Sequence, residues 1–451
     1  MLIPLLLTVV ALQVNEAEVG VAPPVAQISW DGMVEEMDRT SPLMAAARSG
    51  LESYERKLEQ TDWAYFPVFG IEAGAAPVPS ISQGDEQSLN VDWSRWGYVY
   101  RVKATMVQPL YTFGKLTNLK RAALHGIELG NAEIEVARWD LRYRAAQAYY
   151  GAVLAKELRD ILKDGRSWLE RAEQRMVRLR DEDSDDYDQI AHLRLKTRSS
   201  EFYALEAQNE DLDLAAHQGL RLLLSRDADQ PVTPVENTLV AIDAPLLSAE
   251  RYLGASRRTN PQVMRARSGA AATHALADAE WSKLWPDLVL VGEVSQTDSN
   301  AVQPDASEAL PGNVDLGLSG GLLVGIRWDL DVAQTLLKSR DKRAEAQRIG
   351  HQGAVAQDLA ELEIRRLRQR IESTRRLIKA TARSEKAARG WLTATWDLYD
   401  GGFGVFKDVM DALVQYYGKR LNHLQLLQQH NLLFVELSRA VGQDVTKFER
   451  K

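Results

Sequence analysis

Small and apolar residues recur along the first half of the chain in steps of three and four, which is the spacing of a helix packed along one side. No proline occurs between Pro109 and Pro231. The pattern predicts a helix from Lys115 to Arg180, roughly 100 Å long at about 1.5 Å per residue, and a return helix from Asp188 to Leu224. The stripe is rich in Ala and Gly, so we expect close contact with neighbouring helices. It consists of Ala123, Ile127, Gly130, Ile134, Ala137, Leu141, Ala145, Ala148, Ala152, Ala155, Leu158 and Leu162.

The second half of the chain repeats this pattern. Its stripe predicts a helix from Val332 to Leu398 and a return helix from Asp408 to Val441. Two further helices are expected before the long ones, from Ile28 to Glu59 and from Asn260 to Lys283. The second stripe consists of Ala346, Ile349, Gly353, Ala356, Ala360, Ile364, Leu367 and Ile371.

Four segments show the alternation or composition of strands: Val68 to Ala76, Gly97 to Gln108, Leu288 to Ser295 and Leu316 to Trp328. We expect loops from Pro77 to Trp96 and from Thr297 to Val314. Between Gly97 and Gln108, one face carries mostly apolar and aromatic side chains, and the other carries Arg, Lys and Thr. Such a strand is typical of a membrane barrel wall and fits a half-buried soluble sheet as well.

The two halves align with each other at an offset of 219 or 220 residues. Ser41-Pro42 aligns with Asn260-Pro261, Phe66-Pro67 with Trp285-Pro286, Leu110 with Leu330, and Asp188-Gln189-Ile190 with Asp408-Val409-Met410. Four anchors at a nearly constant offset indicate an internal duplication. The sequence therefore predicts a first repeat at 18–230, a linker at 231–250 packed against the helices, a second repeat at 251–445 and a tail at 446–451. A duplicated unit of this kind is typical of an assembly module and not of an enzyme.

The first dozen residues are almost entirely apolar, which resembles the central region of a secretory signal. We interpret residues 1–17 as an export signal with an open cleavage site. The segment has no Lys or Arg, so a misassigned start or a buried N-terminal strand are the alternatives.

Composition excludes several classes of protein. A formal net charge of -8 argues against nucleic-acid binding, which normally needs a basic surface. No internal run of about 18 apolar residues is present, so no transmembrane helix is expected. The absence of cysteine removes disulfides and thiolate metal sites.

Several motifs in this order resemble the TolC-type outer-membrane factors of drug efflux pumps and type I secretion systems. The resemblance spans about Trp30 to Asp444. It rests on Gln108-Pro109-Leu110-Tyr111-Thr112-Phe113-Gly114-Lys115, Asn260-Pro261, Trp285-Pro286-Asp287-Leu288 and Leu437-Ser438-Arg439-Ala440-Val441-Gly442.

The resemblance implies an α+β membrane protein. Three identical chains would form a 12-stranded β-barrel in the outer membrane, with four strands from each chain, continuous with a hollow helical barrel in the periplasm. The implied function is a passive exit channel without catalysis, cofactor or metal. Its implied partners are outer-membrane lipid, a periplasmic adaptor (membrane fusion protein) and an inner-membrane transporter, and no nucleic acid. Independently of the resemblance, four strands have edges that only closure could remove in lipid.

In the family, the two turns between helices at the far periplasmic end form the entrance and bind the adaptor. The first turn here departs from the family because it lacks glycine and holds six acids in nine residues. In a trimer they would form a ring of negative potential that favours or traps cations, although a solvated turn with helix-capping acids explains them equally well. The candidate residues are Asp181, Glu182, Asp183, Asp185 and Asp186 in the first turn, and Asp400, Gly401, Gly402, Phe403 and Asp408 in the second. Asp408 is also expected to cap a helix.

The junctions between strands and helices form a second candidate region, with Pro67, Pro109, Gly114 and Pro286. A further departure is Gln334, where the second repeat has no counterpart of Gly114. Aromatic residues gather at the expected strand ends, as an interfacial belt would, or as core corners do. They are Trp63, Tyr65, Phe66, Trp93, Trp96, Trp285 and Trp328.

The motifs that could indicate catalysis or metal binding are weak. Gly317 to Gly321 matches G-x-S-x-G, but a nucleophile elbow needs a following helix and the sequence continues as a strand. His423 and His430 lie seven residues apart, whereas a helical metal pair prefers four. The alternative to a channel is a soluble or periplasmic coiled-coil scaffold or adaptor. An adaptor would carry a single helical hairpin, so the duplication argues against it.

Overall fold

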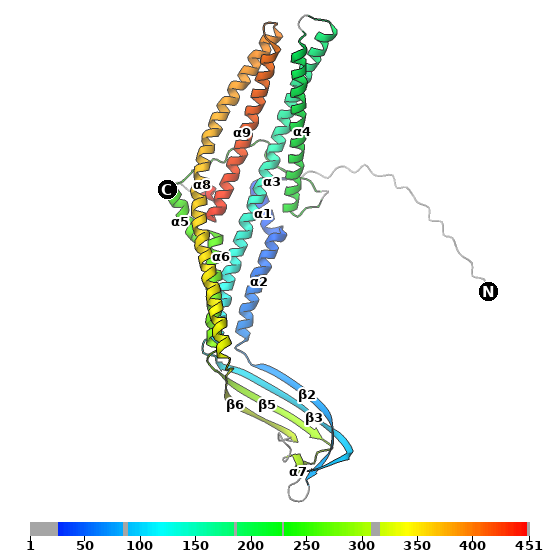
Figure 1. The fold of residues 1–451 in the computed structure, drawn as a ribbon, viewed down its shortest axis with the longest axis vertical. Helices are drawn as coiled ribbons and strands as arrows, with labels where there is room; N and C mark the ends of the chain where they lie inside the picture. Colours follow the sequence, from blue (N-terminus) through cyan, green and yellow to red (C-terminus); the bar gives the residue numbers. More distant parts are fainter. Residues whose placement is uncertain (1–25, 84–88, 185–186, 228–229, 308–315, 449–451) are drawn as a thin grey trace, which may run out of the picture. The chain divides into compact units, whose positions relative to one another are not determined.

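The computed structural model describes residues 26–83, 89–184, 187–227, 230–307 and 316–448 (Figure 1). The predicted export signal and the acids Asp185 and Asp186 lie outside these ranges. The chain divides into two compact units, each built from both halves of the sequence. One comprises Met1–Ser41, Arg142–Ile242 and Thr374–Leu432, and the other Pro42–Leu141, Asp243–Ser373 and Leu433–Lys451.

The main helices and strands occur in the same order in both halves of the sequence. Short helices of 11 residues open each half, α1 (Trp30–Thr40) and α5 (Ala249–Thr259). Helices of 22 residues follow, α2 (Pro42–Trp63) and α6 (Pro261–Ser282). Ser41 has an extended backbone and separates α1 from α2, so the single helix expected from Ile28 to Glu59 is two helices.

The long helices also match between the halves. They are α3 (Lys115–Asp181) with 67 residues and α8 (Val332–Asp400) with 69. Their return helices are α4 (Gln189–Leu223) with 35 residues and α9 (Phe406–Val441) with 36. Each predicted long helix is confirmed to within two residues. Among the described residues, none of the helices combines the length and apolar character needed to span a bilayer.

Glycines on these helices permit close contacts of the kind that the stripes predicted. A Cβ atom at Gly165 of α3 would lie 2.3 Å from the ring of Phe202 on α4. In the other unit, a Cβ atom at Gly130 would lie 3.1 Å from the Cα atom of Leu51 on α2. The helices therefore pack at a separation that larger side chains would prevent.

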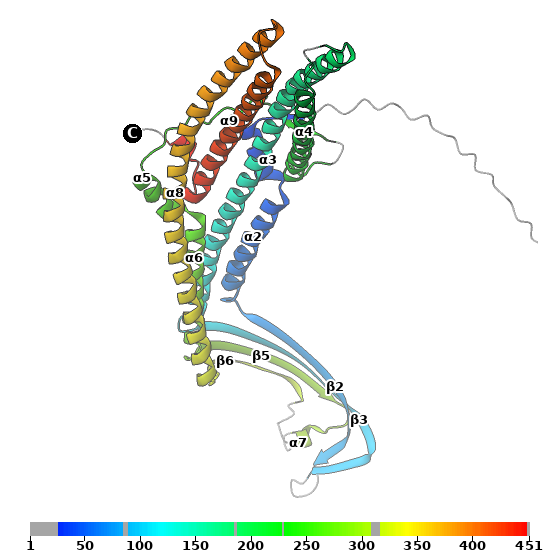
Figure 2. The ribbon, with the colours of Figure 1, turned by 45° about the horizontal axis from the view of Figure 1, so that its top comes forward.

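Four antiparallel strands form one sheet in the order β2-β3-β5-β6 (Figures 1 and 2). They are β2 (Val68–Gln83), β3 (Leu89–Tyr111), β5 (Asp287–Ser299) and β6 (Gly317–Arg327), and the short α7 (Pro304–Ser307) lies between β5 and β6. All four predicted strands are present. The loop expected from Pro77 to Trp96 is wrong, because β2 and β3 continue as a paired ladder to Gln83 and Leu89. Proline is tolerated there because β2 is an edge strand of this sheet.

The linker between the halves contains a strand that the sequence did not reveal. Its β4 (Val232–Pro234) pairs in parallel with β1 (Ala26–Ile28). Asn431 of α9 then binds the linker through both ends of its amide. Its Oδ1 atom accepts a hydrogen bond from the Ile242 N–H at 2.9 Å, and its Nδ2 atom donates to the Val240 carbonyl at 2.9 Å.

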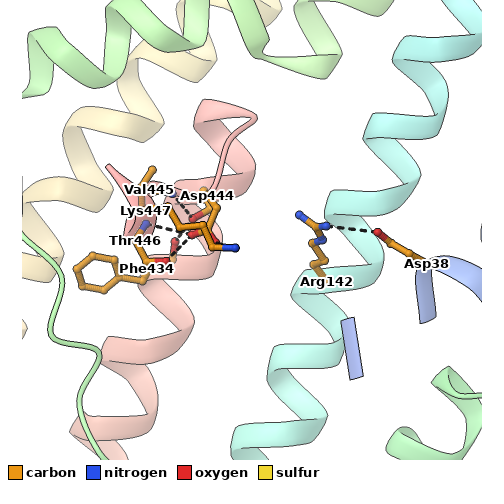
Figure 3. A network of polar contacts seen from close by, with 8 residues as sticks. Asp38, Arg142, Phe434, Asp444, Val445, Thr446 and Lys447 are labelled. Atoms are coloured by element: carbon orange, nitrogen blue, oxygen red, sulfur yellow. Dashed lines mark hydrogen bonds and ion pairs between the residues drawn. The ribbon is translucent and has the colours of Figure 1, made fainter. Parts of the chain in front are cut away.

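Polar contacts connect α1 to α3 in one unit, and the last described residues to α9 in the other. Figure 3 shows Arg142 on α3 directed toward Asp38 on α1, with 3.3 Å between the charged groups. In the other unit, the final 3-10 helix η2 (Val445–Lys447) is capped by Asp444, whose carboxylate accepts a hydrogen bond from the Thr446 N–H at 3.0 Å. The Ser438 hydroxyl of α9 accepts another from the Val445 N–H at 3.1 Å.

Candidate functional site

The four-stranded sheet has two chemically different faces. Residues paired across the ladders point to the same side, so the register Ile71–Ala104–Val294 defines one face and Glu72–Lys103 the other. The first face is mostly apolar, and its large side chains are exposed. They are Phe69, Ile71, Tyr98, Tyr100, Val102, Val294, Leu318, Leu322, Val324 and Ile326. An exposed apolar surface of this extent needs a partner that is itself apolar.

The opposite face carries paired polar and charged side chains. Lys103 lies 2.9 Å from the Glu293 carboxylate, and the Arg101 Nε–H donates to the Thr297 hydroxyl at 3.2 Å. This face holds both signs of charge, so it suits water. The sequence alternation between Gly97 and Gln108 predicted this division for β3, and the register extends it to all four strands.

Both outer strands of the sheet have open edges. β2 pairs with β3, and β6 pairs with β5. Within the described ranges, the only other pairing of either strand is an isolated bridge between Ile81 and Val302. Unpaired backbone groups on two edges are a template for additional strands.

The predicted aromatic residues lie at the two ends of the strands and are exposed. Trp63, Phe66, Trp285 and Trp328 lie beside the helices, and Trp93 and Trp96 lie in the part of β3 farther from the helices. Pro79 of β2 pairs with Trp96, so the two groups are separated by about a dozen residues of strand. That is roughly 40 Å along the strand, and roughly 28 Å at a tilt of about 45°. The spacing matches the apolar thickness of a bilayer.

The predicted junction residues lie where the helices meet the sheet. Pro67 and Pro286 directly precede β2 and β5, and Pro109 lies at an irregularity near the end of β3. Gly114 has a φ of 92° and follows Phe113 with a φ of 47°, so the chain turns from β3 into α3 through two left-handed residues. Lys115 at the start of α3 forms an ion pair with Asp287 of β5.

The corresponding junction in the second half uses different chemistry. Asp331 accepts a hydrogen bond from the Gln334 N–H at 3.4 Å and so caps α8. No residue from Trp328 to Gln334 has a positive φ, so this junction does not need the glycine that the first one has at Gly114.

The first turn between long helices replaces the expected glycine with Asp183, which has a φ of 48°. The Ser184 N–H donates to the Leu179 carbonyl at 3.0 Å, as in a glycine-terminated helix. Asp188 caps α4 by accepting a hydrogen bond from the Ile190 N–H at 2.8 Å. Asp181 pairs with Arg180 at 2.8 Å and raises the pKa of that guanidinium. These contacts give Asp181, Asp183 and Asp188 structural roles, whereas the Glu182 side chain is exposed.

The second turn has the same backbone geometry with glycine. Gly402 has a φ of 77°, and the Phe403 N–H donates to the Leu398 carbonyl at 2.9 Å. Phe403 is 89% exposed, so it is free to contact another molecule. The expectation that Asp408 caps α9 is wrong, because the helix begins two residues earlier, at Phe406. Asp408 instead places its charge in the first turn, where the helix dipole favours an anion.

A cluster that the sequence analysis missed joins α3 to α8 near these turns. Trp168 of α3 and Trp396 of α8 meet edge to face, with ring centroids 4.4 Å apart. Arg175 of α3 lies 3.2 Å from the Asp400 carboxylate and over the ring of Tyr399. The residues come from distant parts of the chain, so only the folded structure brings them together.

The weak chemical motifs have structural explanations. Ser319 of the G-x-S-x-G segment lies in β6, and its hydroxyl is 2.9 Å from that of Ser295 on β5. His423 contacts Thr381, and His430 accepts a hydrogen bond from Arg375 at 3.2 Å. Within the described ranges, no cluster of His, Asp or Glu has the arrangement of a metal site.

No protein-family model and no curated protein sequence matches this chain. Solved structures of low sequence identity do match. The outer membrane protein VceC of Vibrio cholerae has 16% identity and a TM-score of 0.73, covering 92% of this chain and 96% of its own. The CmeC outer membrane channel of Campylobacter jejuni has 13% identity and a TM-score of 0.74, covering 93% and 87%.

The open state of the MtrE outer membrane channel of Neisseria gonorrhoeae has 16% identity and a TM-score of 0.72. It covers 97% of this chain and 96% of its own. The predicted fold, long helices with four antiparallel strands as in the TolC-type channels, is confirmed.

Proposed function

We propose that this chain, which has the fold of TolC-type outer-membrane channels, is a passive exit channel in the bacterial outer membrane. It would serve a tripartite efflux or type I secretion system, with its helical part in the periplasm. The observation that carries the proposal is the two-faced sheet, with an exposed apolar side, a charged side and two open edges.

A trimer of the chain would account for the apolar side, the charged side and the two open edges of the sheet. In lipid, unpaired backbone groups are too costly to persist, so the edges of β2 and β6 need partners. Four strands are too few to close a barrel, whereas three copies supply twelve. The apolar face then contacts lipid, the aromatic residues lie at its two boundaries, and the charged face lines a water-filled passage.

The two helical turns are the proposed entrance and the docking site for a periplasmic adaptor and its inner-membrane transporter. Phe403 offers an exposed apolar contact, and the acids of the first turn form a negative ring in a trimer. Conductance through this entrance would favour cations. Partner contacts would open it by replacing contacts that hold α3 against α8.

The tryptophan pair is expected to hold the entrance more strongly than the ion pair. Asp400 is 67% exposed in its pair with Arg175, and exposed ion pairs contribute only about 0–1 kcal/mol. Two packed aromatic rings contribute about 0.5–1.5 kcal/mol beyond the burial of their area. Trp396→Ala should therefore raise single-channel open probability more than Asp400→Ala does, measured in planar bilayers. Asp400→Ala removes only the ion pair, because the contact of Arg175 with the Tyr399 ring remains. Trp396→Phe keeps a ring and is the control; a larger effect of Asp400→Ala would contradict the ranking.

Conductance of the detergent-purified protein in a planar bilayer, with its mass measured by light scattering, tests the proposed function. Discrete, cation-favouring channels formed by a trimer are the expected result. The alternative, a soluble or periplasmic coiled-coil scaffold, predicts a monomer or dimer that needs no detergent and never inserts.

A further inference from the structure

The segment that follows β5 folds back over the end of the sheet. In the sheet order, β3 lies between β2 and β5, yet this segment reaches β2 through the bridge between Val302 and Ile81. It therefore crosses β3. We call residues 300–307, which include α7, the crossover segment. Figures 1 and 2 show α7 inside the curve that the ends of β2 and β3 form.

The crossing lies at Gly97 of β3. A Cβ atom at Gly97 would lie 2.7 Å from the Ala301 Cβ atom and would also meet the Asn300 side chain. The alternation along β3 places Gly97 on the same face as Lys103, which is the charged face. The crossover segment therefore lies against the charged face, where glycine leaves room for it.

Hydrogen bonds attach the crossover segment to both strands of the long hairpin. The Ile81 N–H of β2 donates to the Ala301 carbonyl at 2.8 Å, and the Ile81 carbonyl accepts from the Gln303 N–H at 3.0 Å. The Tyr98 N–H of β3 donates to the Asn300 Oδ1 atom at 2.8 Å. These bonds hold the segment in one place over the strands.

Burial is confined to the end of the charged face that the crossover segment occupies. Val302 is 7% exposed and Ala306 of α7 is 0% exposed. Thr297, near the end of β5 on the charged face, is 2% exposed. Glu293 lies on the same face farther from this end, and its side chain is 46% exposed. The far end of the charged face is therefore covered, whereas its middle is open.

An irregularity in the long hairpin lies beside the crossing. Pro79 pairs with Trp96, but the next residue, Ser80, pairs with Asp92. Extra residues on one strand of a pair bend that strand. The irregularity accounts for the curve of β2 and β3 around α7.

We propose that the crossover segment narrows the outer opening of the passage and sets the largest molecule that can leave through it. This inference rests on the proposed channel, in which the charged face lines the passage. Three copies of the segment then project from the wall at its outer end. Because backbone hydrogen bonds hold each copy on the strands, the segments form a fixed constriction. The helical turns control entry, and the crossover segments limit the size of what leaves.

A single thiol below the constriction tests this inference, because the chain has no cysteine. Gly321 of β6 pairs with Glu293 on the charged face, and a Cβ atom there would have no neighbour within 4 Å. Channels of Gly321→Cys in planar bilayers are treated with maleimide-polyethylene glycol of increasing mass, added on the side of the sheet. Labelling is detected as block of the current. The reagent reaches residue 321 through the outer opening, so the entrance at the helical turns does not limit it.

Two changes in the Gly321→Cys chain displace or loosen the crossover segment. Gly97→Leu places a side chain where Ala301 and Asn300 lie, so it should shift the size limit for labelling to larger reagents. Asn300→Ala removes the acceptor of the Tyr98 N–H without adding bulk, and it should shift the limit in the same direction by less. Light scattering and circular dichroism check that both variants form folded trimers, and Asn300→Ala decides the test if Gly97→Leu does not.

Gly74→Leu is the matched control. Gly74 pairs with Arg101 on the charged face, and a Cβ atom there would have no neighbour within 4 Å. The same side chain then enters the passage without touching the crossover segment, so the size limit should not rise. An unchanged limit in channels of both Gly97→Leu and Asn300→Ala, or an equal rise with Gly74→Leu, would overturn the constriction and leave the channel standing. A Gly321→Cys chain that forms no channels would overturn the proposed function, and the constriction with it.

Discussion

Leu322→Arg is expected to abolish assembly in the outer membrane, whereas the same change at the adjacent Leu323 is expected to be tolerated. The two leucines are neighbours in the middle of β6 and are 75% and 65% exposed, but they point to opposite faces of the sheet. Leu322 belongs to the apolar face, and arginine facing lipid near the bilayer centre costs about 2–4 kcal/mol in each chain. Leu323 belongs to the charged face, where water hydrates an arginine.

The measurement is the amount of trimer recovered from the outer membrane, by size exclusion with light scattering. Comparing two adjacent leucines removes strand propensity and residue size as explanations. If both variants assemble equally well, the apolar face does not contact lipid, and the proposed barrel is wrong. If only Leu323→Arg fails, the faces are assigned the wrong way round.

Gly442→Ala is expected to destabilise the protein by at least about 3 kcal/mol, because two effects combine. Gly442 has a φ of 82°, and a left-handed backbone costs a residue with a side chain about 1–2 kcal/mol. A Cβ atom would also lie 2.0 Å from the Thr259 carbonyl oxygen, which is backbone and cannot rotate away. Thr259 is itself tied to α9 by a hydrogen bond from its hydroxyl to the Val441 carbonyl at 2.8 Å.

Gly402→Ala separates the two effects. Gly402 has a similar φ of 77°, but a Cβ atom there has no neighbour within 4 Å. In this variant the free energy of unfolding should fall only by the cost of the left-handed backbone, about 1–2 kcal/mol. Thermal unfolding followed by circular dichroism gives both values, and equal losses would show that the contact with Thr259 relaxes at little cost.

Patterns in the sequence predicted the long helices well because their apolar stripes continue for many turns without proline. The strand ends were predicted poorly. Pro77 and Pro79 are typical of a loop, and only the sheet order reveals that β2 is an edge strand, where prolines are tolerated. The strand β4 has three residues, too few to show any alternation, and its partner β1 is distant in the sequence.

The turns show how a motif can be absent while its geometry remains. The first turn has no glycine, yet Asp183 adopts the left-handed conformation that Gly402 adopts at the equivalent place. Aspartate enters this region more readily than most residues, which makes the substitution possible. By contrast, the Trp168–Trp396 pair joins helices from both halves of the chain, and no local pattern in the sequence predicts such a contact.

The two hairpins of the sheet differ in length. β2 and β3 have 16 and 23 residues, whereas β5 and β6 have 13 and 11. In the proposed trimer these hairpins alternate around the wall, so three hairpins with long strands and three with short strands border the outer opening. The opening then has threefold symmetry, although the chain is duplicated and six hairpins form the wall. A molecule that recognises this opening from outside the cell would find three equivalent positions on it, not six.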